Sequence, residues 1–217
     1  ENVGYDPRKD FAGVSLLASG YQMLAVHPSL PVRSVKQLVA LAKARPGELN
    51  SASANIYTTG HLAVELFNSV TGVRIVPIHY KGSGLAATAV LSGEVHMIFT
   101  ATSSLLPYVQ AKRIVALGVT SPARSPRAPE VPTLAESGVK GVETGNWYGL
   151  AGPAAMPKDV IGRLYGELAK ISAAPDYRDQ LEKQGLEMQT STPEQFAVFL
   201  LAEYDKWGKV IKSLKLQ

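Results

Sequence analysis

The sequence has no cysteine among its 217 residues. Thiol catalysis, Cys-ligated metal sites and disulfide bridges all need that side chain, so each of them is excluded. No stretch approaches the roughly 18 continuous apolar residues of a membrane-spanning helix. The opening residues, "ENVGYDPRKDF", contain neither a starting Met nor an apolar signal core. We therefore expect the sequence to begin inside a longer protein.

The chain also has little excess charge. Its 22 Lys and Arg residues against 18 Asp and Glu residues give a net charge of +4, and the basic residues are spread along the chain. A nucleic-acid-binding protein normally concentrates its basic residues on one surface, so no nucleic-acid partner is expected. Apolar residues at 46% and charged residues at 18% are typical of a globular protein. The mild positive charge suits an anionic ligand or an ordinary solvated surface.

Apolar runs of strand length alternate with segments of helical periodicity through nearly the whole chain. This alternation is typical of an α/β fold with a largely parallel sheet. The repeated strand, turn and helix units predict one α/β lobe over residues 22–142. The flanking segments, 1–21 and 143–217, predict a second lobe. The chain would then cross twice between the lobes, and a small ligand is expected in the cleft.

Hydroxyl residues mark several expected helix starts. One helix is expected to begin at Thr58 or Thr59 and to end at Gly72. Three further pairs have the spacing of a capping box, in which each residue bonds the other's backbone N–H: Ser34 with Gln37, Thr133 with Glu136, and Thr192 with Gln195.

Two of the expected helices have an apolar stripe, which is more typical of a buried core than of a cofactor site. The stripe of the helix after Thr58 contains Leu62, Leu66 and Val70. The stripe of the long closing helix contains the following residues: Phe196, Phe199, Leu200, Tyr204, Trp207 and Ile211.

Three expected turns between a strand and a helix are rich in small hydroxyl or glycine residues: 53–59, 81–84 and 100–104. Ligands of parallel α/β sheets bind at the carboxyl ends of the strands, where such turns lie. A helix start offers unpaired N–H groups and a partial positive charge, so it can bind a carboxylate or phosphate without a lysine. The hydroxyls of Thr58, Thr59, Thr102 and Ser103 would add directed hydrogen bonds. Any one of these turns alone is explained better by ordinary N-capping. The three turns together at one edge of the sheet modestly favour an anion site.

Catalytic patterns are weak by comparison. The four histidines lack the spacing of zinc ligands, and neither a G-x-S-x-G elbow nor a Walker loop is present. His61, on the first turn of a helix, is expected to make a structural hydrogen bond. No nucleophile has an obvious base beside it, and no pair of carboxylates stands out. We therefore expect no catalytic residues, no metal and no cofactor.

Several motifs together resemble the periplasmic solute-binding proteins of tripartite tricarboxylate transporters, often called the Bug family. The resemblance runs in order and spacing from about residue 5 to 210 and is carried by these segments: "YDPRKDF", "VSLLASG", "LAVHPSLPVRSVKQLVALAKARPGELN", "HLAVELF", "PIHYKGSG", "IFTATSSLLPYV", "IVALGVTSPARSPRAPEVPTLAESG" and "NWYGLAGPAAMPKDVI".

The resemblance implies a type II periplasmic-binding fold, with two α/β lobes that close on a small carboxylate-bearing solute and deliver it to a membrane permease. Family ligands include di- and tricarboxylates, amino acids and aromatic acids. The family's cleft positions fall here on the following residues, the last of them in the return crossover: Ser53, Ala54, Asn55, Thr58, Thr59, Tyr80, Gly82, Ser83, Thr100, Ala101, Thr102 and Trp147.

The chain departs from the family pattern in three places. Members often have Asp-Asn where this chain has Thr100-Ala101, which disfavours an amino-acid ligand. Asn55-Ile56-Tyr57 replaces a tight glycine turn and is expected to narrow the pocket or stack on an aromatic acid. The family's first strand and Gly-rich loop precede the "YDP" segment and are missing here, so the first lobe is expected to be incomplete. Uncovered apolar surface would then favour self-association or weaken binding.

Two other function classes use the same architecture. An effector-binding module of a signalling system is one alternative, although no helix-turn-helix segment or basic recognition helix appears in the sequence. An enzyme on the same fold is the other, and the absence of an acid-base pattern disfavours it.

Overall fold

The computed structural model describes residues 4–213, which fall into two compact units. Unit 1 is taken from Glu1–Ser19 and Trp147–Gln217, and unit 2 is Gly20–Asn146. Both divisions fall inside strands, β1 (Phe11–Val26) and β6 (Gly145–Pro153). The assignment of residues 22–142 and of their flanks as lobes of a binding protein stays a prediction.

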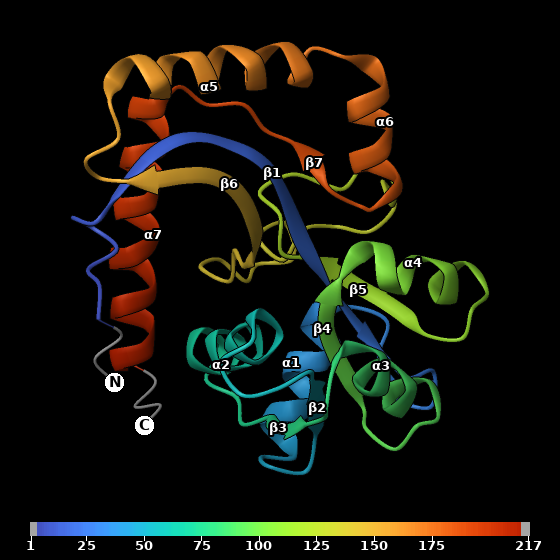
Figure 1. The fold of residues 1–217 in the computed structure, drawn as a ribbon. Helices are drawn as coiled ribbons and strands as arrows, with labels where there is room; N and C mark the ends of the chain where they lie inside the picture. Colours follow the sequence, from blue (N-terminus) through green and yellow to red (C-terminus); the bar gives the residue numbers. More distant parts are fainter. Residues whose placement is uncertain (1–3, 214–217) are drawn as a thin grey trace. The chain divides into compact units, whose positions relative to one another are not determined.

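Unit 2 is built on a sheet of order β3-β2-β4-β1-β5, to which β1 contributes its C-terminal part (Figure 1). The other strands are β2 (Asn50–Ser53), β3 (Val76–His79), β4 (Met97–Ala101) and β5 (Val115–Val119). Strand β2 runs parallel to β3 and β4, whereas β1 is antiparallel to both β4 and β5. The expected α/β class is confirmed, with a mixed sheet in which β1 is the reversed strand.

Four helices connect these strands: α1 (Val35–Ala44), α2 (Thr59–Thr71), α3 (Ser83–Leu91) and α4 (Thr102–Gln110). Helices α2, α3 and α4 pack on strands β2, β4 and β5. The large side chains between helix and sheet are fully buried, Phe67 of α2 and Phe99 of β4 among them, with ring centroids 5.9 Å apart. In this connectivity, each parallel strand ends where the next helix begins. These junctions position the candidate site.

Local sequence signals explain where the helices of unit 2 begin and end. The hydroxyl of Ser34 accepts the N–H of Gln37 at 3.2 Å, as a capping residue should, but the Gln37 side chain accepts the N–H of Arg33 rather than that of Ser34. Helix α2 ends at Gly72, whose φ of 66° is left-handed and is readily adopted only by glycine.

Two local expectations for unit 2 are wrong. Thr133 and Glu136 form both bonds of a capping box, at 2.7 and 3.0 Å, yet residues 134–138 make turns and not a helix. Gly138, with φ of 88°, stops the segment before a second helical turn can form. Val70, expected on the buried stripe of α2, is 47% exposed, because it lies in the last turn of the helix.

Unit 1 consists of the first part of β1, most of β6, the short strand β7 (Glu187–Met188) and three helices: α5 (Lys158–Ser172), α6 (Pro175–Lys183) and α7 (Pro193–Ser213). Both β6 and β7 pair with β1. Phe196 of α7 is 1% exposed and packs on the backbone at Gly13 and Gly149, where an added Cβ would lie 2.9 and 2.2 Å from its ring. The capping box expected at Thr192 begins α7, with bonds of 2.9 and 3.2 Å.

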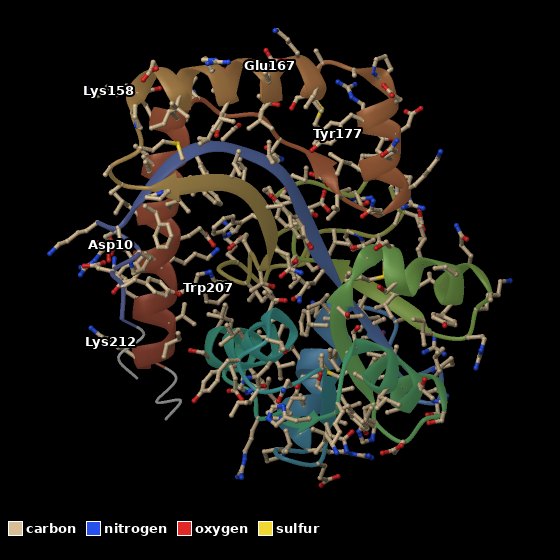
Figure 2. The ribbon with its side chains drawn as sticks, in the orientation of Figure 1. Asp10, Lys158, Glu167, Tyr177, Trp207 and Lys212 are labelled. Atoms are coloured by element: carbon tan, nitrogen blue, oxygen red, sulfur yellow. The ribbon has the colours of Figure 1, made fainter. Side chains whose placement is uncertain are left out.

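The apolar stripe of α7 is core only near its N-terminal end. Phe196 is buried and Phe199 half-buried, whereas Tyr204 is 43% and Ile211 39% exposed, so only part of the expected stripe is core. The Arg8 guanidinium lies over the Tyr204 ring at 4.9 Å, so a polar side chain covers this part of the helix. Trp207 lies on the same helix (Figure 2). Its indole N–H donates to the Glu203 carboxylate at 2.9 Å.

Across residues 4–213, each helix is either too short or too polar to serve as a bilayer-crossing segment.

Candidate functional site

Unit 2 has a pocket of about 500 Å³ at the carboxyl ends of β2 and β4. This is the place where parallel α/β sheets bind ligands. Its walls come from β1, β4, the starts of α2, α3 and α4, and the segment that enters β6: Gln22, Ala54, Tyr57, Thr58, Thr59, Gly60, Ser83, Ala86, Ile98, Phe99, Thr100, Ala101, Ser104 and Asn146.

The two adjacent threonines in the pocket wall have different tasks. Thr58 is the N-cap of α2: its hydroxyl donates to the carbonyl of Asn55 at 2.8 Å and accepts the N–H of His61 at 3.4 Å. Its proton is therefore committed to the turn. The Thr59 hydroxyl instead accepts a hydrogen bond from the side-chain amide of Gln22 at 2.9 Å. Within residues 4–213 its own proton has no protein acceptor, so it is available to a ligand in the pocket.

The start of α2 lies very close to β4 because residue 60 is glycine. A Cβ added at Gly60 would lie 2.6 Å from the carbonyl oxygen of Phe99, closer than any real Cβ contact. The absence of that side chain lets the first turn of α2 rest on the strand and also opens the pocket wall. Thr59 and Gly60 occupy the first positions of the helix, where backbone N–H groups have no intrahelical acceptor.

Two more helices begin at the same pocket without a capping side chain. Gly82 precedes α3 with φ of 115°, and Ala101 precedes α4, and neither accepts a hydrogen bond from its helix through a side chain. Ser83 and Ser104, in the first turns of these helices, line the pocket. Each helix start carries about half a positive charge. The first turns of α2, α3 and α4 contain no acidic residue that would neutralise it.

The pocket lining itself has no Lys, Arg, His, Asp or Glu side chain. Any attraction for an anion must therefore come from backbone N–H groups, hydroxyls and helix dipoles. Such groups bind carboxylates and phosphates well when several point to one spot. Because apolar side chains of Ala86, Ile98 and Phe99 share the lining, the pocket suits an organic acid with a hydrocarbon part.

Behind the α2 start, His61 holds the backbone of the preceding turn. Its Nδ1 accepts the N–H of Tyr57 at 3.1 Å, which confirms the expected structural hydrogen bond. Tyr57 has a left-handed φ of 61°, an unusual conformation for a bulky residue, so this bond stabilises a strained position in the pocket wall. Burial, together with the nearby His79 ring, lowers the pKa of His61 below its ordinary value of 6.5.

The family described as "Tripartite tricarboxylate transporter family receptor" matches residues 1–216. The chain belongs to this family. It is 36% identical over 215 residues to a "UPF0065 protein in tcbD-tcbE intergenic region" of Pseudomonas sp. (strain P51), covering 99% of this chain and 64% of that protein. The chain spans 64–65% of the length of the three curated relatives "UPF0065 protein in tcbD-tcbE intergenic region", "UPF0065 protein in gbd 5'region" and "Protein BugT".

Solved structures of the receptor family show the same fold. An R. palustris protein solved with adipate is 34% identical, with a TM-score of 0.83 over 98% of this chain and 71% of that one. The periplasmic binding protein BugD is 26% identical, with a TM-score of 0.82 over 100% of this chain and 73% of that one. The resemblance inferred from sequence motifs is therefore confirmed, and with it the fold.

Six of the twelve expected site residues come together in the pocket of this receptor-family chain: Ala54, Thr58, Thr59, Ser83, Thr100 and Ala101. They come from the three turns that were expected to share one rim. Of the turn at residues 55–57, Tyr57 lines the pocket and Asn55 does not; the Asn55 side chain accepts the N–H of Ile56 at 2.8 Å. Gly82 caps α3 beside the pocket.

Four expected residues have other surroundings. Ser53 is buried and its hydroxyl lies 2.7 Å from Nδ1 of His79, outside the lining. The Thr102 hydroxyl donates to the carbonyl of Tyr21 at 3.2 Å. The Tyr80 hydroxyl donates to Glu94 at 2.8 Å, and desolvation together with this bond raises the pKa of Tyr80 to about 12. Trp147 lies in unit 1, where its ring meets the edges of two phenylalanines.

Sequence reasoning missed three polar or backbone contributors to the pocket, namely Gln22, Gly60 and Asn146, and it included Ser104 only as the end of the turn 100–104. A signal existed for Gln22, because it directly precedes the apolar run "MLAV" of an expected strand. The structure buries it to 4% exposure. A buried polar side chain needs hydrogen-bond partners, so such a position marks a network. No comparable signal marks Asn146, which reaches the pocket only through the return of the chain toward β6.

A larger hollow of about 860 Å³ lies along the edge strand β5 and the start of α1. Its lining mixes Arg33, Lys36 and Lys112 with Glu130 and Glu136, and the one helix start that it contains is already capped by Ser34. It therefore lacks the converging free donors of the smaller pocket. Within residues 4–213, no group of three or more His, Asp or Glu side chains is arranged to hold a metal ion.

Proposed function

We propose that this chain is the ligand-binding part of a periplasmic receptor that captures a small carboxylate-bearing solute for a tripartite tricarboxylate transporter. The observation that carries the proposal is the meeting of three helix starts at one pocket without charged side chains. A carboxylate there would accept hydrogen bonds from backbone N–H groups and from the Thr59 hydroxyl. The membrane permease as partner, the periplasmic location and self-association are parts of the same proposal.

The solved relative with adipate supports a dicarboxylate as the first ligand to try. Adipate carries two carboxylates on a four-carbon chain, which matches a pocket that combines helix starts with apolar walls. Capture without chemical conversion is also favoured by the hydroxyl of Ser53, which lies beside a histidine but is 1% exposed and outside the lining. A buried hydroxyl of this kind cannot reach a substrate.

Thermal unfolding with and without adipate, hereafter the dicarboxylate probe, tests the proposal. A ligand that binds only the folded state at about 100 times its Kd stabilises it by about 2.7 kcal/mol. For a chain of this size, that gain raises Tm by roughly 5–10 °C. Adipamide has the same length and no charge, so it is the matched control and should produce a much smaller shift.

Equal shifts in Tm from adipate and adipamide would contradict an anion-binding site. If no mono-, di- or tricarboxylate shifts Tm, the proposed function is contradicted. Titration calorimetry at two salt concentrations separates specific binding from surface attraction. Binding to enclosed backbone donors should weaken only slightly with salt, because screening acts mainly on exposed charges.

A further inference from the structure

The pocket contains one buried polar side chain whose two ends are both hydrogen-bonded. Gln22 lies on β1 opposite Ala101 of β4 and is 4% exposed. Its side-chain nitrogen donates to the hydroxyl of Thr59 at 2.9 Å, and its side-chain oxygen accepts the hydroxyl of Thr144 at 3.0 Å. Gln22 thus joins α2 to the segment that precedes β6, all within unit 2.

The neighbouring hydrogen bonds fix which end of this amide faces which threonine. Thr144 is 1% exposed, and Gln22 is the partner of its hydroxyl in the described part of the chain. A buried hydroxyl whose proton finds no acceptor is costly, so Thr144 must donate, and the amide oxygen must face it. Thr120 holds both sides in place: its hydroxyl accepts the N–H of Gln22 at 2.9 Å and donates to the carbonyl of Thr144 at 2.5 Å.

The orientation of the Gln22 amide affects the ligand pocket through Thr59. With the amide oxygen taken by Thr144, the amide NH₂ of Gln22 faces Thr59 and occupies the hydroxyl oxygen as an acceptor. A free hydroxyl can donate or accept. The Thr59 hydroxyl accepts from Gln22 through one lone pair, and within residues 4–213 its own proton has no protein acceptor, so that proton is available to a ligand in the pocket. The backbone groups at the three helix starts are donors as well, so the pocket presents donors on several sides.

We propose that Gln22 is a specificity-determining residue: by holding the Thr59 hydroxyl as a pocket donor, it makes the site select ligands that present an anionic acceptor. This inference rests on the proposed function. Gln22 would act indirectly, because the Thr59 hydroxyl, and not Gln22, would donate the hydrogen bond to the ligand. The Thr58 hydroxyl has no such role, since its proton is bound to the carbonyl of Asn55.

The orientation of the amide can be tested without any ligand. The side-chain NH₂ of Gln22 gives a pair of signals in a ¹⁵N-HSQC spectrum. Thr59→Val removes the acceptor of that NH₂, so its signals should shift and exchange faster with water. Thr144→Val should leave them much less changed, because Thr144 bonds the oxygen end. The reverse pattern would show a flipped amide and would overturn the inference.

Selectivity is tested by Gln22→Glu, which has the same shape but, when ionised, accepts hydrogen bonds at both ends. Thr59 would then donate to residue 22 and show only lone pairs to the ligand. Affinity for the dicarboxylate probe should fall at least 100-fold, whereas affinity for adipamide should change less than fivefold. Circular dichroism and urea unfolding check that each variant is folded under the binding conditions.

A double-mutant cycle separates this effect from the simple addition of a negative charge. In the Thr59→Val background the charge of Gln22→Glu is still present, but no hydroxyl is left to reverse. The factor by which Gln22→Glu lowers affinity for the dicarboxylate probe should therefore be at least tenfold smaller there than in the chain that keeps Thr59. In the Thr58→Val control background the loss should keep its full size.

Equal losses in the Thr59 and Thr59→Val backgrounds would overturn the role of Gln22 while leaving the receptor proposal intact. Failure of the unmutated chain to bind any organic acid would overturn the receptor proposal itself, and the selectivity of Gln22 with it.

Discussion

A single methyl group added at Gly60 should separate α2 from β4 and damage the pocket. The new Cβ would lie 2.6 Å from the carbonyl oxygen of Phe99. A normal C···O contact needs about 3.3 Å. The helix start must therefore move by roughly 0.7 Å, and overpacking of this kind costs about 1–3 kcal/mol. Alanine gains about 0.5–1 kcal/mol over glycine inside a helix, so Gly60→Ala should change the free energy of unfolding by a net loss of about 0–2.5 kcal/mol.

Gly166→Ala in α5 is the matched control, since an added Cβ there meets nothing within 4 Å. It should stabilise the chain by about 0.5–1 kcal/mol. Urea unfolding followed by circular dichroism measures both variants, and amide hydrogen exchange locates the change of Gly60→Ala at α2. Equal stabilisation by the two substitutions would refute the close approach of α2 to β4. Gly60→Ala should also weaken binding of the dicarboxylate probe, and unchanged affinity would refute the placement of that helix start in the site.

The two adjacent threonines should differ in their effect on affinity. Thr58→Ala removes the N-cap and costs about 1 kcal/mol of stability with little loss of affinity. Thr59→Val leaves the buried Gln22 amide without its acceptor, which costs about 1–3 kcal/mol of stability, and it also weakens the dicarboxylate probe about 10- to 150-fold, the value of one hydrogen bond to a charged group. A loss of affinity in Thr58→Ala as large as that in Thr59→Val, measured by calorimetry on the folded variants, would contradict the contacts drawn for them. His61→Asn keeps an acceptor for Tyr57 but cannot titrate. Because the pKa of His61 is lowered in the fold, the unfolded chain binds the proton more readily below pH 6.5. Stability is therefore lost as pH falls from 7.5 to 5, by less in His61→Asn than in the unmutated chain; equal losses in urea midpoints would count against this.

The sequence could predict the parts of the site that depend on neighbouring residues. The start of α2 at Thr58 and Thr59 follows from capping chemistry, and its end at Gly72 follows from a left-handed φ. The order of strand, turn and helix then places residues 54–59 and 98–104 at one rim, because carboxyl ends of parallel strands meet there.

Long-range contributors could not be predicted in the same way. Gln22 and Asn146 reach the pocket from segments far from α2 in sequence, and their positions depend on β1 running antiparallel to β4. The need for glycine at position 60 arises from one carbonyl of β4, which no local pattern reveals. The turn after Thr133 has the capping bonds of a helix, but a left-handed glycine soon after decides its shape.

The most direct test of the account is a ¹⁵N-HSQC titration of the chain with the dicarboxylate probe. Backbone N–H signals of Thr59, Gly60 and Ser83 should move downfield and saturate together, because new hydrogen bonds form at helix starts that converge on one pocket. Adipamide should not reproduce these shifts. If binding saturates while the N–H signals of those three residues do not shift, the claim that exposed helix starts bind the carboxylate is contradicted.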